Sequence, residues 1–112
     1  MTSRWKLQLL TGAALAAVAL SGSLNAQGKS ASDIYLDKCS VCHGADGAGK
    51  TAKGKKLKVK DVREQVTKLT AEQMAEVVTK GKDPDMDAFG KEFTPEQIRE
   101  MVAYYRELAK KK

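Results

Sequence analysis

Residues 39–43 read Cys-Ser-Val-Cys-His, and they contain both cysteines and the only histidine of the 112-residue chain. The residues just before this pentapeptide have helical spacing, so the motif is predicted to lie at the end of a helix. Two thiols three positions apart on a helical turn project from the same side, and the imidazole follows directly after the second thiol. This stretch indicates a functional site more clearly than any other part of the sequence.

Two thiols at this spacing can add across the two vinyl groups of one haem, and the adjacent imidazole then lies under the ring, where it can bind the iron. Cys-x-x-Cys-His is the pattern of c-type haem attachment. The sequence therefore predicts one haem per chain, bonded to Cys39 and Cys42, with His43 as an axial ligand of the iron.

Three other sites use similar residues. A thioredoxin-like dithiol needs a βαβ setting, and no strand is predicted in this sequence. A structural zinc site needs four ligands, and an iron–sulfur cluster needs more cysteines than the two present. These readings fit the sequence poorly.

Outside the motif, the N-terminus has the order of a secretory signal peptide. Arg4 and Lys6 are followed by the apolar stretch Leu7–Leu20 and then by small and polar residues. The stretch is shorter than the ~20 apolar residues of a spanning helix. We expect cleavage after Ala26, with Ser23 as the second possibility, and hence a periplasmic or secreted protein.

This cleavage would divide the chain into a signal peptide, residues 1–26, and one domain, residues 27–112. The formal net charge would fall from +6 to +4, because two basic residues leave with the peptide. A domain of this size buries little surface and usually needs a staple, a metal or a cofactor. Two cysteines are too few for a disulfide scaffold, so the sequence favours a cofactor.

We predict an all-α fold of three or four short helices wrapped around one haem. The predicted helices run from a cap at Ser30 or Ser32 towards Cys42, from Asp61 through Leu69, from a Thr70 capping box to Gly81, and from Thr94 to Leu108. Residues 44–60, rich in glycine and lysine, and the aperiodic residues 82–93 are predicted loops. Long loops are unusual in a small domain unless they wrap a ligand.

A second axial ligand cannot be histidine from the same chain, and methionine is the next choice. Met74 and Met101 lie on the apolar stripes of predicted helices, which indicates core packing. Met86 lies in the aperiodic loop between aspartates, and a thioether is a good soft ligand for haem iron. Met86 is therefore the candidate ligand, the alternative being a loop methionine with no role.

Nearly all of residues 27–112 resembles class I cytochrome c of the small bacterial mono-haem kind. The resemblance rests on three stretches: C-S-V-C-H-G-A-D-G-A-G at 39–49, M-D-A-F at 86–89, and T-P-E-Q-I-R-E-M-V-A-Y-Y-R-E-L at 94–108. It implies the cytochrome c fold and an electron-transfer protein that is not an enzyme, with Met86 as the distal ligand.

The resemblance also implies that the first and last helices cross. Ala31 and Tyr35 would then pack near Met101 and near Tyr104 or Tyr105.

The sequence departs from the family pattern in three places. Asp87 replaces the usual proline after the ligand methionine. No proline follows the haem motif, where the family often uses a prolyl carbonyl to hold the proximal imidazole. Residues 27–112 also lack tryptophan. These departures leave the rigidity of the ligand loop and the reduction potential open.

Charged residues crowd two segments near the predicted haem. Six lysines fall within residues 50–60, and three aspartates surround Met86. The lysines could steer an acidic redox partner to the haem edge, or they could be a solvated loop that keeps a small protein soluble. Aspartates close to the iron and poorly solvated would lower the potential, whereas exposed ones would be screened. Nucleic acid is a poor partner, because no aromatic residues are interleaved with the lysines.

The sequence thus predicts a monomeric cytochrome that carries single electrons between redox partners outside the cytoplasm, without a transmembrane segment in the mature chain. Two alternatives remain at this stage. If Met86 does not bind the iron, the protein could be a gas sensor or a peroxidase-like enzyme with an open sixth position. The domain could also be the haem subunit of a larger oxidoreductase complex.

Overall fold

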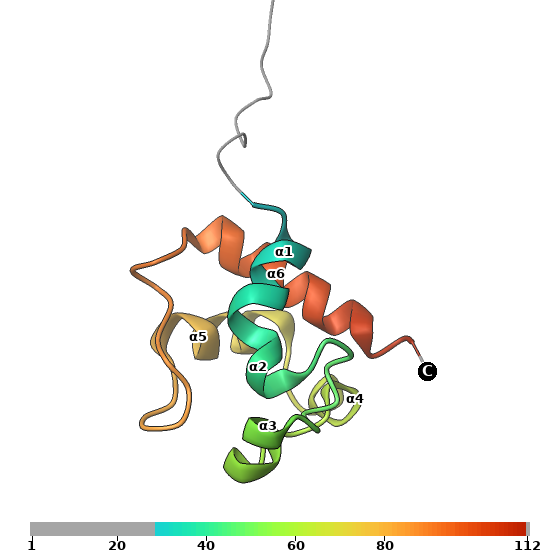
Figure 1. Ribbon diagram of the computed structural model, residues 1–112. Helices are drawn as coiled ribbons and strands as arrows, with labels where there is room; N and C mark the ends of the chain where they lie inside the picture. The colour runs from blue at the N-terminus through green and yellow to red at the C-terminus, as the bar shows by residue number, and fades with distance from the viewer. Residues whose placement is uncertain (1–28, 112) are drawn as a thin grey trace, which may run out of the picture.

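The computed structural model describes residues 29–111, and within this range the chain is helical with no strand (Figure 1). The all-α prediction is confirmed, although the helical segments are shorter and more numerous than predicted. They are α1 (Ala31–Ile34), the π-helical segment η2 (Tyr35–Cys39), α2 (Ser40–His43), α3 (Ala52–Leu57), α4 (Val62–Gln65), α5 (Ala71–Lys80) and α6 (Pro95–Leu108).

The predicted helix towards Cys42 is present, but a π-helical turn interrupts it. Ser30 is its cap, because the Ser30 hydroxyl accepts the Asp33 N–H at 3.1 Å. At the end of η2 the Ser40 N–H donates to the Tyr35 carbonyl, five residues back. The Ser40 hydroxyl also donates to the Leu36 carbonyl at 2.6 Å. This turn ends at Cys39, the first residue of the cysteine motif, and π-turns are frequent at functional sites.

The prediction of a continuous loop over residues 44–60 is wrong, because α3 lies within it. Thr51 caps this helix by accepting the Gly54 N–H at 2.9 Å. Lys58 ends it in the left-handed conformation, with φ of 60°. The glycine content suggested a loop, but lysine is itself a good helix former.

The remaining boundaries follow the predicted caps. Asp61 caps α4, which is shorter than predicted and gives way to turns before Leu69. Thr70 and Thr94 each form a complete capping box at the start of α5 and α6, as predicted. Residues 82–93 are not helical, and their one bridge pairs Lys82 with Met86.

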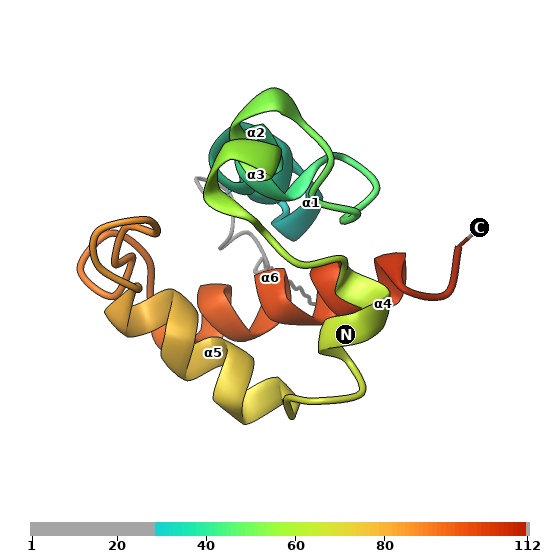
Figure 2. The same ribbon diagram turned by 90° about the horizontal axis from the view of Figure 1, so that it is seen from below.

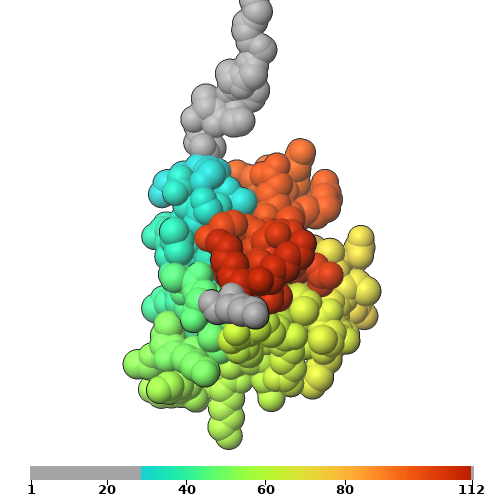
Figure 3. Space-filling view, turned by 90° about the vertical axis from the view of Figure 1, so that its right-hand side faces the viewer, coloured from blue at the N-terminus to red at the C-terminus, as the bar shows by residue number. Residues whose placement is uncertain are grey.

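Helix α6 packs against α5 on one side and against the N-terminal helices on another (Figures 2 and 3). One buried cluster joins Ile34, Met74, Ile98, Met101 and Val102, and Ala31 packs against it. A second cluster joins Tyr35, Val62 and Leu108, with Tyr104 and Tyr105 packed against it. The predicted crossing of the first and last helices is confirmed.

The predicted signal peptide lies outside the described residues. Between residues 29 and 111, no helix has the length and apolar character needed to cross a bilayer.

Candidate haem site

The two thiols and the imidazole lie on consecutive helical turns. Cys39 ends η2, whereas Cys42 and His43 belong to α2. Both cysteines are free and half-buried. Burial raises the pKa of the Cys39 thiol to about 11, and the nearby Cys42 adds to the shift. The Cys39 thiol is therefore protonated near neutral pH.

One ring nitrogen of His43 is turned towards the interior of the protein. Its Nδ1 is buried, and no residue within 29–111 gives it a hydrogen-bond partner. Desolvation by burial lowers the pKa of the imidazole, which favours the neutral form that binds metals. The ring packs edge-on against Tyr105, with centroids 5.3 Å apart and planes at 74°.

Backbone hydrogen bonds hold the chain just after His43. The His43 carbonyl accepts the Gly49 N–H at 2.8 Å. The Gly44 carbonyl accepts the Gly47 N–H at 3.0 Å and the Tyr35 hydroxyl at 2.7 Å. Tyr35 is 2% exposed, and burial raises its pKa above the usual 10.0, so its hydroxyl remains a donor. The turn behind the histidine is therefore tied to the helix in front of the cysteines.

Two residues that sequence reasoning did not single out attach α3 to the motif. The Thr51 hydroxyl donates to the Val41 carbonyl at 2.7 Å. A Cβ at Gly54 would overlap the carbonyl oxygens of Cys42 and Gly49, so only glycine fits there. In the sequence, only the occurrence of a glycine within a run of lysines could have indicated this close contact. The pattern does not predict which residues the glycine contacts.

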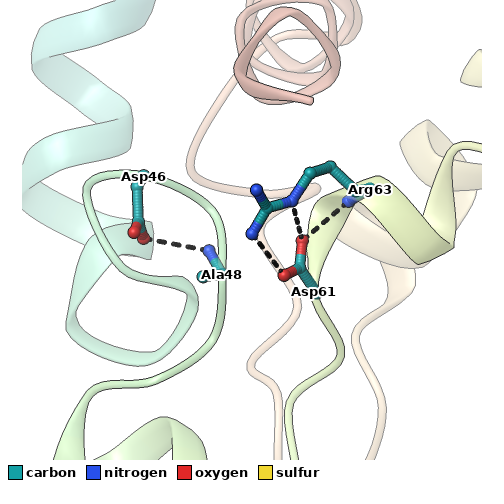
Figure 4. A network of polar contacts seen from close by, with 4 residues as sticks. All are labelled: Asp46, Ala48, Asp61 and Arg63. Carbon is teal, nitrogen blue, oxygen red and sulfur yellow. Dashed lines mark hydrogen bonds and ion pairs between the residues drawn. The ribbon is translucent and has the colours of Figure 1, made fainter. Parts of the chain in front are cut away.

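Two carboxylates stabilise the turns that follow the motif (Figure 4). Asp46 accepts the Ala48 N–H at 3.0 Å. Asp61 accepts the Arg63 backbone N–H at 2.8 Å and binds the Arg63 guanidinium through both oxygens, at 3.0 and 2.7 Å. These hydrogen bonds from Arg63 lower the pKa of Asp61 to about 2. Because its charge is matched, Arg63 acts as a structural partner of Asp61.

Met86 lies on a separate segment, and the backbone holds that segment firmly. Lys82 and Met86 exchange two backbone hydrogen bonds of 2.8 Å each. Further along, Phe89 donates to the Val78 carbonyl at 2.9 Å and Gly90 to the Thr79 carbonyl at 3.1 Å. The loop is thus closed at its base and tied to α5 without a proline at position 87. Met86 is partly buried, and its role as the distal ligand stays a prediction.

The aspartates around Met86 are exposed to solvent. Asp83, Asp85 and Asp87 all lie on the surface of this loop. Water and salt therefore screen their charges, which was one of the two outcomes left open by the sequence.

The other two methionines of the described chain are core residues, as predicted. Met74 is 5% exposed and Met101 is 4% exposed, and both lie in one cluster. The Arg106 guanidinium donates to the Leu69 carbonyl at 3.1 Å and lies 3.8 Å from the Met74 sulfur. Met74 therefore packs in the core, and a side chain of α6 contacts its sulfur.

The donor set on this turn fits covalent haem attachment. It offers two neighbouring thiols and a neutral imidazole whose Nδ1 points into the protein, which leaves Nε2 for a metal. Within residues 29–111, no group of three or more His, Cys, Asp or Glu side chains could hold a metal ion by themselves.

Comparisons with known proteins identify the family of the chain. A family model described as cytochrome c oxidase, cbb3-type, subunit III matches residues 26–104. The solved structure of the KustC0563 c-type cytochrome is 28% identical, with a TM-score of 0.66, covering 71% of this chain and 98% of that one. A point mutant of Kustc0563 is 27% identical, with a TM-score of 0.65, covering 71% and 99%.

No curated protein matches the chain. The family match spans well over half of the sequence and includes the whole Cys-x-x-Cys-His motif. The chain therefore belongs to the c-type cytochromes, in the family described as cytochrome c oxidase, cbb3-type, subunit III.

Proposed function

We propose that this protein is a mono-haem cytochrome that carries single electrons between redox partners, with Cys39 and Cys42 as thioether links and His43 and Met86 as axial ligands. Family membership implies covalently bound haem c and haem-based electron transfer. Bound haem c supplies a reversible one-electron iron couple. The observation that supports our assignment most directly is the turn that holds two half-buried thiols beside His43, whose Nδ1 is buried.

In this proposal the protein's own residues set ligation and access. The thiols of Cys39 and Cys42 fix the position of the group, and the hydrogen-bonded turn after His43 fixes the backbone of the proximal ligand. The thioether of Met86 favours the ferrous state, because sulfur is a softer donor than imidazole or water. The closed base of the Met86 loop supports this role by limiting its movement.

The family indicates a protein that works outside the cytoplasm. We propose export to the periplasm or beyond by the predicted signal peptide of residues 1–26. Edman sequencing of the mature protein would test the cleavage site, and an N-terminus that retains Met1 would refute the proposal.

Extraction of the cofactor tests the central proposal. We expect acidified organic solvent to leave the haem on the purified protein, because two thioether bonds hold it. We also expect a low-spin spectrum in both oxidation states. Haem that extracts freely, or a preparation with zinc and no haem, would refute the proposal.

The family description itself favours a second candidate, in which the domain serves as a haem subunit of a larger oxidoreductase complex. Native mass measurement of the protein from its source cells separates the two. A free electron carrier would be found as a haem-containing monomer, whereas a subunit would be found in a larger haem-containing particle.

We also propose that the face next to Cys42 docks an acidic redox partner. Helix α3 carries exposed lysines and is anchored to the motif through Thr51 and Gly54, so these charges are held in place. The exposed lysines of this segment are Lys50, Lys53, Lys55, Lys56, Lys58 and Lys60. On α2, which packs against α3, Val41 is 54% exposed. An apolar centre beside fixed positive charge suits a partner with an acidic rim.

Electron exchange with hexacyanoferrate, an anionic probe, tests this surface. Changing Lys53, Lys55 and Lys56 to Glu should slow the exchange at low salt and flatten its dependence on ionic strength. The control makes the same charge change elsewhere, at Lys68, Lys110 and Lys111, and should slow the exchange less. Equal effects in both variants would mean that the net charge of the protein sets the exchange rate. The lysines of α3 would then have no specific role in docking.

A further inference from the structure

The proximal histidine lacks the contact that usually orients such a ligand. A metal-binding histidine commonly donates its other ring N–H to a carboxylate, a backbone carbonyl or a water, which fixes the plane of the ring. In this protein the buried Nδ1 of His43 has no partner among residues 29–111. No side chain or carbonyl within residues 29–111 therefore fixes the imidazole plane through Nδ1.

The backbone carbonyls of His43 and Gly44 accept hydrogen bonds from groups other than the imidazole. The His43 carbonyl accepts from Gly49, at 2.8 Å. The Gly44 carbonyl accepts from Gly47 and from the Tyr35 hydroxyl, which fills both of its acceptor positions. These bonds fix the backbone around His43, but they leave rotation of the ring about its side-chain bonds unrestrained.

An aromatic contact supplies the missing restraint. The Tyr105 ring meets the His43 ring edge-on at 5.3 Å, an arrangement that aromatic pairs prefer. Tyr105 is itself held by Tyr35, at 6.0 Å, and Tyr35 by Tyr104, at 5.3 Å. Tyr35 is almost fully buried and its hydroxyl is bonded to Gly44. The three tyrosines of the chain thus form one packed group, and only Tyr105 of that group has a ring contact with His43.

We propose that Tyr105 is a positioning residue for the proximal ligand: its ring, backed by Tyr35, sets the plane of the His43 imidazole in place of a hydrogen bond to Nδ1. The inference rests on the proposed haem ligation by His43. It assigns the role to the aromatic ring and not to the hydroxyl. The two rings pack edge-on against each other, and the buried Nδ1 of His43 accepts or donates no hydrogen bond with Tyr105.

The holoprotein in the ferric state offers a direct readout. The hyperfine-shifted proton resonances of the four haem methyl groups report the orientation of an axial imidazole plane in low-spin ferric haem. Tyr105→Leu removes the ring, so the pattern of these four resonances should change. Tyr105→Phe keeps the ring and should retain the wild-type pattern. Tyr104→Leu is the matched control, since it removes a ring that contacts Tyr35, and it should also retain the pattern.

The outcomes separate this inference from the proposed function. Wild-type protein without covalent low-spin haem would refute the proposed function itself. With that established, an unchanged methyl pattern in Tyr105→Leu would overturn the positioning role. A pattern that changes equally in Tyr104→Leu or in Tyr105→Phe would also overturn it. If Tyr105→Leu does not fold, Tyr105→Ile and Tyr105→Met take its place, and Tyr105→Phe still tests the ring against the hydroxyl.

Discussion

At the scale of single residues, Met86 and His43 are held by different means. The backbone of Met86 is paired with Lys82 across the base of its loop, while its side chain is only partly buried. His43 has a fixed backbone on both sides and an aromatic neighbour against its ring. We therefore expect the distal side of the haem to respond to side-chain changes more readily than the proximal side.

Substitution of Met86 should alter ligation with little effect on folding. Met86→Ala should open the iron to water, cyanide and carbon monoxide, because the thioether is lost. Met86→His should keep low-spin iron but lower the reduction potential, because imidazole stabilises ferrous iron less than a thioether does. Absorption spectra and potentiometry of the purified variants measure both effects.

The buried methionines are the controls for this prediction. Met74→Leu and Met101→Leu conserve volume, so each should cost less than about 1.5 kcal/mol of unfolding free energy and leave the spectrum unchanged. Loss of the methionine–ferric charge-transfer band in either control, with the band retained in Met86→Ala, would show that the ligand is assigned wrongly. Rapid carbon monoxide binding by the wild-type ferrous protein would favour the sensor or enzyme alternative.

Tyr35 gives a prediction with a defined pH dependence. Tyr35→Phe removes the hydrogen bond to the Gly44 carbonyl and should cost about 1 kcal/mol at pH 7. Burial raises the pKa of Tyr35 above its usual 10.0. The folded protein therefore holds this proton more tightly than the unfolded chain, and the stability of the wild type falls as the pH rises above 10.0.

The Phe variant lacks this ionisation, so the difference between the two proteins should shrink above that pH. Denaturant unfolding between pH 7 and 11 measures it, with Tyr104→Phe as a control that removes a hydroxyl from the same group. A difference that stays constant through pH 11 would contradict the buried-phenol account.

At the scale of elements, α3 supports the cysteine motif. Its cap residue Thr51 bonds to the Val41 carbonyl, and Gly54 lies directly against the Cys42 carbonyl. The lysines on its outer face are exposed. One six-residue helix therefore packs against the turn of the cysteine motif on one side and presents charge to solvent on the other.

Replacing Gly54 by Ala should disturb this packing. The added Cβ has no room beside the carbonyls of Cys42 and Gly49, so the backbone of α3 must shift. We expect a loss of about 1–3 kcal/mol of stability, as for other overpacked sites. Chemical denaturation of the holoprotein measures the loss. Lys53→Ala changes an exposed position of the same helix and should stay within about 0.5 kcal/mol of the wild type.

At the scale of the whole molecule, the polypeptide has a small core. Residues 29–111 contain nine buried apolar side chains, and eight of them are divided between two clusters that both include residues of α6. Several of the helices are only four to six residues long, too short to be stable alone. We therefore expect the fold to depend on the cofactor as a third packing element.

Removing both thiols tests this dependence. Cys39→Ala combined with Cys42→Ala prevents covalent attachment, and the resulting chain should be largely unfolded, because the remaining core is small. Circular dichroism during heating should show no cooperative transition. A sharp transition in this double variant would mean that the two clusters are sufficient for folding.

The sequence by itself determined the features that depend on neighbouring residues. The capping boxes at Thr70 and Thr94 form locally, and both helices begin where predicted. The stripe on the last helix placed Met101 in the core, because an apolar face at helical spacing has only one way to be buried. The Cys-x-x-Cys-His spacing likewise predicted the family and the class of cofactor, and the family match confirms this prediction.

Tertiary structure decided what depends on residues distant in sequence. Helix α3 forms where glycines predicted a loop, because Gly54 and Thr51 contact the turn of the cysteine motif. The contact of Tyr105 with His43 joins residues about sixty positions apart, and no local pattern encodes it. The Arg106 guanidinium donates to the Leu69 carbonyl, 37 positions earlier in the chain. In each case a side chain or backbone group meets a partner that only the packed chain brings near, so spacing along the sequence could not predict the contact.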